Sequence, residues 1–156
     1  DKFFSVAMHS LLVVEELKKQ GHNSDMQMIG LLHDASEAYI CDIPRPLKKM
    51  LPDYRDIESK VQDTIYKKYL GRIPSPKELD VLNNVDTEIL LYEAKHLVKH
   101  NSWMWKEPEV EVGYVDLISV MCSQPIVRKD FMLEFTKIEC NSVNSGGNYY
   151  GEKRSS

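Results

Sequence analysis

The chain has 156 residues, of which 42% are hydrophobic and 28% charged, the proportions of an ordinary globular domain. Its length predicts one domain with a core large enough to need no disulfide or metal staple. With 20 basic and 24 acidic side chains the formal net charge is −4, so no bulk attraction draws the chain to nucleic acid or to an anionic membrane. No apolar run approaches the ~18 residues that a membrane span needs.

The cysteines are three in number and show no CxxC spacing; they are Cys41, Cys122 and Cys140. This odd count argues against a disulfide framework and against a cysteine zinc site. We expect reduced thiols and a cytoplasmic protein, since the composition is not that of a signal or transit peptide. The chain opens on Asp-Lys-Phe-Phe rather than on Met, already close to a helical pattern, so we expect further residues upstream of it.

Two helices are predicted in the first quarter of the chain. Apolar residues recur every three or four positions over residues 5–20, and Gly21 ends this first helix. Ser24 with Gln27 resembles a capping box for a second helix over 24–38. That segment is apolar on most of its faces, which predicts a helix buried at the centre of the fold.

Prolines divide the rest of the chain into further elements. Two of them break the helix and hold a defined loop over 41–48, in which Pro46 could open a short helix. The apolar period predicts amphipathic helices over 52–70 and 77–100, and a last short helix over 126–138.

The remaining segments are less regular. Residues 101–125 have a mixed pattern, with a possible β-alternation only at 109–115. Residues 141–156 are mostly Asn, Ser, Gly, Lys and Arg, and we expect a mobile tail there. The predicted fold class is all-α, with a single domain over 1–140 built as a layered bundle of five to seven helices.

Polar residues stand at positions that the helical period places inside this bundle. His33 and Asp34 lie in the middle of the most apolar helix, and Glu37 follows His33 by four residues on nearly the same face. His9 sits on the apolar stripe of the first helix, and Asp86 on that of the long helix. Burying an imidazole and a carboxylate is costly unless a partner or a metal compensates.

Two imidazoles and two carboxylates suit a divalent first-row metal such as Zn, Co, Mn, Fe or Ni. We therefore predict His9, His33, Asp34 and Asp86 as ligands. Such a metal would lower the pKa of a bound water and so supply a nucleophile for hydrolysis, with Glu37 as general base or acid. Taken singly, each residue has an ordinary alternative, because a lone His on an apolar stripe is commonly a satisfied core residue.

Other polar and aromatic residues have simpler structural explanations. His22 lies in a turn and is expected to be solvated. His96 and His100 have the i, i+4 spacing of a metal pair, but they lie near a helix C-terminus, where the dipole alone favours a cationic imidazole. Trp103 and Trp105 are expected to pack against the bundle, with a pocket or an oligomer contact as the alternative.

Four segments, in this order, resemble the HD-domain metal-dependent phosphohydrolases. They are Ser5-Val-Ala-Met-His9-Ser10, Leu32-His33-Asp34-Ala-Ser-Glu37-Ala38, Asp42-Ile-Pro-Arg-Pro-Leu-Lys48 and Val85-Asp86. Over about residues 4–100 the chain is similar to the branch that holds the YfbR-type 5′-deoxynucleotidases and the phage dATP triphosphohydrolases. The resemblance implies an HD-type helical bundle that binds a divalent metal through the four ligands above, with Glu37 as the acid–base carboxylate.

The same resemblance implies three further roles in the loop that follows. Asp42 would lie beside the scissile phosphate, Pro46 would line the base pocket, and Lys48 would contact phosphate oxygens. From the residues alone, Lys48 is simply a basic residue exposed after a turn. Two features depart from the family pattern. The phosphate-clamping Arg upstream of the first ligand has no counterpart among these residues, and Asn83 stands where a basic residue is common.

The sequence thus predicts metal-dependent hydrolysis of a deoxynucleotide 5′-phosphate linkage. The first choice is a dNTP (dATP) triphosphohydrolase that releases deoxynucleoside, and the alternative is a 5′-deoxynucleotidase on dNMPs. A non-catalytic nucleotide-binding module and a purely structural bundle remain as alternatives of another class. We expect a deoxynucleotide as the partner rather than a nucleic-acid polymer or a membrane. We also expect a homo-oligomer, as family members commonly form, and location in the host cytoplasm if the protein is phage-encoded.

Overall fold

The computed structural model describes residues 4–97 and 124–144, and these residues form seven helices and no strand. The prediction of an all-α fold is therefore confirmed. The helices are α1 (Val6–Lys19), α2 (Ser24–Leu31), α3 (Glu37–Ile40), α4 (Arg45–Lys48), α5 (Pro52–Tyr69), α6 (Pro76–Leu97) and α8 (Gln124–Asn144).

Local capping explains where the first two helices begin. The Ser5 hydroxyl accepts a hydrogen bond from the Met8 amide at 3.2 Å and starts α1. The Asn23 side chain accepts one from the Met26 amide at 3.0 Å and starts α2. The N-cap of α2 is thus Asn23, one residue before the predicted Ser24, because it is the Asn23 side-chain oxygen that reaches the unpaired amide.

The predicted helix over 24–38 is wrong in its second half. It ends at Leu31, and α3 begins only at Glu37. Residues 32–36 form tight turns, in which the Ala35 amide donates to the carbonyl three residues back rather than four, as does the Glu37 amide that follows. The prediction that His33 and Glu37 share one face of a continuous α-helix is therefore wrong.

A side chain from α5 explains this break. The Gln62 amide group donates to the Leu32 carbonyl at 2.7 Å and accepts from the Ser36 amide at 3.1 Å. Gln62 thereby satisfies backbone groups that a continuous helix would pair internally. The turns are thus fixed by a residue about thirty positions away.

The longer helices follow the sequence pattern closely. The predictions over 5–20 and 52–70 match α1 and α5 to within a residue, and α6 starts one residue before the predicted 77. In α4, Pro46 stands at the second position rather than the first. None of the described helices combines the length and apolar character needed to cross a lipid bilayer.

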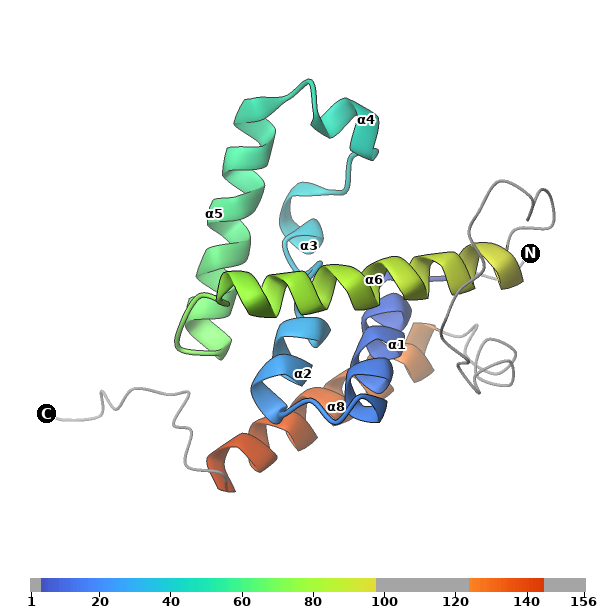
Figure 1. Cartoon of the computed structure of the whole chain (residues 1–156), viewed down its shortest axis with the longest axis vertical. Helices are drawn as coiled ribbons and strands as arrows, with labels where there is room; N and C mark the ends of the chain where they lie inside the picture. The colour runs from blue at the N-terminus through green and yellow to red at the C-terminus, as the bar shows by residue number, and fades with distance from the viewer. Residues whose placement is uncertain (1–3, 98–123, 145–156) are drawn as a thin grey trace, which may run out of the picture.

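Helices α1 and α2 lie between α6 on one side and α8 on the other (Figure 1). Their contact surfaces are apolar, and each fully buried Leu, Ile or Met contributes about 1.5–3 kcal/mol relative to an exposed one. The largest completely buried side chains are Leu12, Leu17, Met28, Ile29, Leu31, Ile89 and Ile138. This core fixes α1, α2 and α6 relative to one another, and all four predicted metal ligands lie on or next to these helices.

Helix α8 is longer than the predicted 126–138 and extends into the predicted tail. The tail boundary at 141 is therefore wrong by four residues, because Ser142 is still buried on the same packed helix as Ile138. The described residues do not include the rest of the tail. They also do not include residues 101–123, where the possible strand at 109–115 is predicted.

Candidate metal centre

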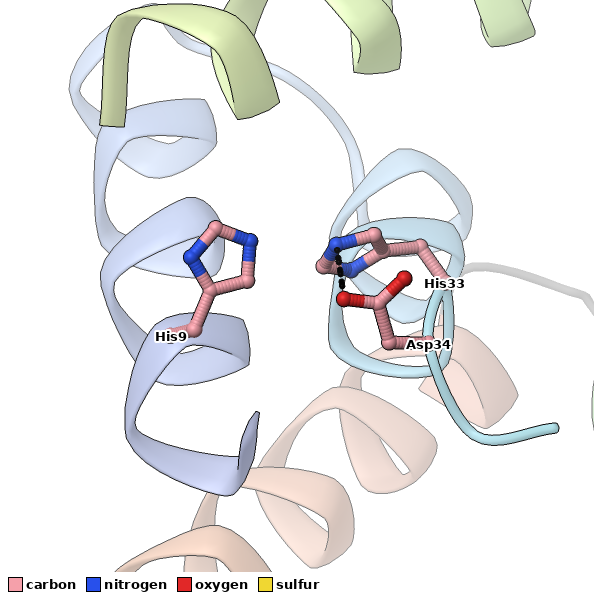
Figure 2. Close-up of side chains that lie close together, drawn as sticks. All are labelled: His9, His33 and Asp34. Atoms are coloured by element: carbon pink, nitrogen blue, oxygen red, sulfur yellow. Dashed lines mark ion pairs between the residues drawn. The ribbon is translucent and has the colours of Figure 1, made fainter. Parts of the chain in front are cut away.

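The predicted ligands converge where α1, the end of α2 and α6 meet. His9 lies on α1, His33 and Asp34 in the turns directly after α2, and Asp86 on α6. The side chains of His9, His33 and Asp34 face one another, and each offers a ligand atom within 4.8 Å of the others (Figure 2). From α6, Asp86 Oδ1 lies 3.0 Å from His9 Nε2 and 3.8 Å from His33 Nε2.

The imidazole of His33 is oriented by the backbone. Its Nδ1–H donates to the Gly30 carbonyl at 2.8 Å, so Nε2 points toward the cluster. Nε2 is buried and has no hydrogen-bond partner in the described part of the chain, although Asp34 Oδ2 lies only 3.1 Å away. A buried ring nitrogen that faces carboxylate oxygens without a hydrogen bond is the arrangement expected where a cation binds between them.

His9 is held between two carboxylates of α6. Its Nε2 pairs with Asp86 Oδ1, and its Nδ1 pairs with Glu93 Oε1 at 2.8 Å. Burial disfavours the charged imidazole, but the hydrogen bonds to Asp86 and Glu93 outweigh it and raise the pKa of His9 to about 10. Without a metal, His9 is thus a cation that holds both carboxylates in place.

Asp34 is kept ionised by its neighbours. Burial works to raise its pKa, but the pairing with His33 and the nearby charges of His9 and Lys48 outweigh this and leave the pKa below its ordinary value. An ionised carboxylate is the form that binds a metal. The cluster offers two imidazole nitrogens, from His9 and His33, and the carboxylates of Asp34 and Asp86. This donor set, in which the buried Nε2 of His33 has no hydrogen bond, fits a divalent transition metal.

A cavity of about 700 Å³ opens beside the cluster. Asp34, Glu37 and Asp42 all contribute to its wall, and much of the rest of the wall is apolar. Its apolar and aromatic side chains include Leu31, Ala35, Ile65, Tyr69, Phe131 and Phe135. This size and lining are typical of a small-molecule site, in which a few polar groups orient a mostly buried ligand.

Glu37 opens α3 and is half-buried at the cavity wall. Burial, and then the charges of Asp34 and Asp42, raise the pKa of Glu37 to about 7. A carboxyl group with this pKa can both take up and release a proton at neutral pH. The structure thus brings Glu37 to the same cavity as Asp34 even though the helix between them is broken.

Of the three predicted substrate residues in the loop after α3, one lines the cavity and two do not. Asp42 lines the cavity, and Lys48 Nζ lies 2.9 Å from Asp42 Oδ1 and 2.7 Å from Glu58 Oε1. Lys48 therefore joins this loop to α5, and two carboxylates balance its charge. Pro46 is exposed and is not among the described residues that line the cavity. The roles of all three toward a substrate stay predictions.

The loop that carries Asp42 starts from a strained residue. Cys41 has φ 62° and ψ 158°, a backbone conformation that costs of order 1–3 kcal/mol for a residue with a side chain. The Tyr54 hydroxyl on α5 donates to the Cys41 carbonyl. Such strain persists only where the surrounding structure holds the chain firmly, and here it sets the direction in which the chain leaves α3 toward Asp42.

Sequence reasoning missed Glu93, although its position carried a signal. Glu93 follows Asp86 by seven residues, which places both on the same face of α6 two turns apart.

Of the other candidates, His22 is half-buried in its turn, and His96 is exposed with Nδ1–H donating to the Tyr92 carbonyl. Neither belongs to the cluster. The predictions for His100, Trp103 and Trp105 lie outside the described residues.

The chain is similar in sequence to known proteins, over part of its length. No family model matches it. It is 42% identical over 67 residues to the uncharacterized protein YfdR of Escherichia coli strain K12, a match that covers 43% of this chain and 35% of that protein. It is 27% identical over 93 residues to the 5′-deoxynucleotidase PM0747 of Pasteurella multocida, which covers 58% of this chain and 48% of that protein. The chain thus spans less than half the length of these curated relatives.

Proposed function

We propose that this protein is a metal-dependent phosphohydrolase of the HD type that acts on a deoxynucleotide. The observation that carries the proposal is the buried Nε2 of His33, which faces Asp34 and Asp86 without a hydrogen bond and lies next to a second imidazole. The similarity to a 5′-deoxynucleotidase supports the same reaction class.

Each residue of the site has a distinct task in this proposal. His9, His33, Asp34 and Asp86 hold the cation, which when bound lowers the pKa of water and stabilises negative charge on the phosphate. Glu37 takes the proton of the attacking water or delivers one to the leaving 5′-oxygen. Water adds to phosphorus and gives up one proton, the bond from phosphorus to the 5′-oxygen breaks, and the deoxynucleoside leaves with one proton on that oxygen.

The cavity supports a nucleoside as the group that carries the phosphate. Its apolar wall can bury a base and a deoxyribose, while Glu37 and the proposed ligand Asp34 supply carboxylates to the same wall. The aromatic rings of Tyr69 and Phe135 meet edge to face, with centroids 5.5 Å apart, and form a firm side of the pocket.

Two observations favour a monophosphate as the substrate to test first. The named relative is a 5′-deoxynucleotidase. Lys48 contacts the cavity carboxylate Asp42, but it is already paired with both Asp42 and Glu58. A triphosphate needs more cationic partners. The second candidate, a dATP triphosphohydrolase, is supported by the resemblance of the loop from Asp42 to Lys48 to phage enzymes.

A panel of dNMPs, dNTPs and NTPs tests the proposal, with the products identified by phosphate chain length. Metal-supplemented protein should release orthophosphate from dNMPs or tripolyphosphate from dNTPs, and chelator should stop the reaction. Tight nucleotide binding without turnover would instead support the non-catalytic module. No binding, together with a melting temperature that does not respond to chelator or metal, would leave a structural bundle.

A further inference from the structure

Glu93 adds another buried carboxylate on the opposite side of His9 from Asp86. Its side chain is 10% exposed, and its Oε1 accepts the Nδ1 proton of His9 at 2.8 Å. Asp86 Oδ1 lies 3.0 Å from Nε2 of the same ring. Because the two carboxylates stand seven residues apart on one helix, roughly 10 Å along its axis, the imidazole fits between them.

Only one edge of the His9 ring faces the metal cluster. Around Nε2 lie Asp86 and the ligand atoms of His33 and Asp34. Nδ1 is directed to Glu93, on the far edge of the ring. Glu93 therefore supports the imidazole from behind rather than competing for a place on the same cation.

We propose that Glu93 is a positioning residue of the metal centre. By holding the Nδ1 proton it fixes the tautomer and the rotation of His9, so that the Nε2 lone pair is directed at the cation. The inference rests on the proposed function, because it requires that cation. Removing such a carboxylate from a metal-binding imidazole typically weakens metal binding 10–100-fold.

The two imidazoles are supported in different ways. His33 rests on the backbone carbonyl of Gly30, which a substitution does not remove. His9 rests on a side chain, so its support can be deleted and measured. A merely structural Glu93 would join α1 to α6 and lower stability when removed, with no specific effect on the cation.

Glu16 provides a matched control for this distinction. Like Glu93 it is a buried glutamate on a packed helix, and the two whole residues are equally exposed, at 8%. Its Oε1 accepts a hydrogen bond from Gln20 Nε2 at 2.9 Å and belongs to no part of the described cluster. Glu16→Leu thus removes a buried carboxylate from the same fold without touching His9.

Co²⁺ binding measured by titration calorimetry, with the visible spectrum of the Co²⁺ form, tests the inference. We expect Glu93→Leu to bind Co²⁺ 10–100-fold more weakly than the parent protein, while Glu16→Leu keeps the parent affinity. Glu93→Gln should stay within a few-fold, because its amide oxygen still accepts from Nδ1–H. A folded Glu93→Leu protein with the parent affinity and spectrum would overturn the proposal.

Glu93→Asp covers the case in which the leucine variant does not fold. It withdraws the carboxylate by one methylene, and we expect weaker binding and a changed Co²⁺ spectrum; parent values for both would overturn the proposal. His9→Ala distinguishes a failure of the inference about Glu93 from a failure of the proposed metal centre itself. If the parent protein binds no Co²⁺, or if His9→Ala binds it equally well, the proposed function fails and the role of Glu93 fails with it.

Discussion

Replacing Gly30 by alanine tests whether the contact between α1 and α2 sets the spacing of the two imidazoles. A Cβ atom on Gly30 would lie 2.4 Å from Leu17 Cδ1 and 3.2 Å from Val13 Cγ1. Both side chains are completely buried, so neither can swing into solvent and the helices must separate. The same glycine supplies the carbonyl that orients His33.

The expected loss of stability follows from two opposing effects. Overpacking of a core contact costs about 1–3 kcal/mol, whereas alanine in place of glycine inside a helix stabilises by about 0.5–1 kcal/mol. The net loss of stability lies between about 0 and 2.5 kcal/mol and centres near 1 kcal/mol, which corresponds to a fall in Tm of roughly 2–4 °C for a chain of this length. Co²⁺ affinity should fall as well, because His33 moves relative to His9.

Denaturant unfolding of a double-mutant cycle with Leu17→Ala measures this contact. Leu17→Ala alone should cost about 2–5 kcal/mol, but it also makes room for the new methyl group of Gly30→Ala. The stability losses of the two single variants should therefore add up to at least about 1 kcal/mol more than the loss measured in the double variant. Strict additivity of the two losses would refute the reasoning.

Four further predictions concern the site and one ion pair. Asp34→Asn should abolish metal binding and hydrolysis together, as followed by calorimetry and phosphate release. Glu37→Ala should retain the metal and the Tm but lower kcat by roughly 10²–10⁴; full activity would remove it from the mechanism. Lys48→Ala should raise KM for substrate more than it lowers Tm, and an effect on Tm alone would make Lys48 a purely structural clamp. The bidentate pair with Arg72 lowers the pKa of Glu78 to about 2, so the pair contributes its full stability above pH ~4.5 and loses it as the pH falls through 2. The stability gap between the parent and R72M, about 1 kcal/mol or less at neutral pH, should therefore shrink between pH ~4.5 and pH ~2, and an undiminished gap at the lower pH would contradict the assignment.

The helices that could be predicted are those whose signals are local. Ser5 caps α1, and prolines begin or precede α5 and α6. The residues that start each of these helices therefore lie next to the apolar period that predicts it. The break between α2 and α3 could not be predicted, because Gln62 on another helix imposes it. The end of α8 could not be predicted for a similar reason, because packing buries Ser142 and extends the helix into a segment of polar composition.

The site shows the same division between local and distant causes. The four predicted ligands stand out as charged or polar residues in apolar segments, and the structure brings them together. The family resemblance implies a phosphate contact for Lys48, whereas its pairing with Glu58 depends on how α5 packs beside the loop and has no local signal. The buried carboxylate of Glu93 lay on the predicted stripe of α6 and required only that the stripe be followed two turns beyond Asp86.

The central claim is that one cation binds between the two imidazoles and the two carboxylates. Anomalous diffraction from crystals soaked in Mn²⁺ tests it most directly. We expect a single strong peak about 2.0–2.3 Å from Nε2 of His9 and of His33 and from oxygens of Asp34 and Asp86. A structure in which these side chains remain paired with one another, with no anomalous peak between them at saturating Mn²⁺, would contradict the account.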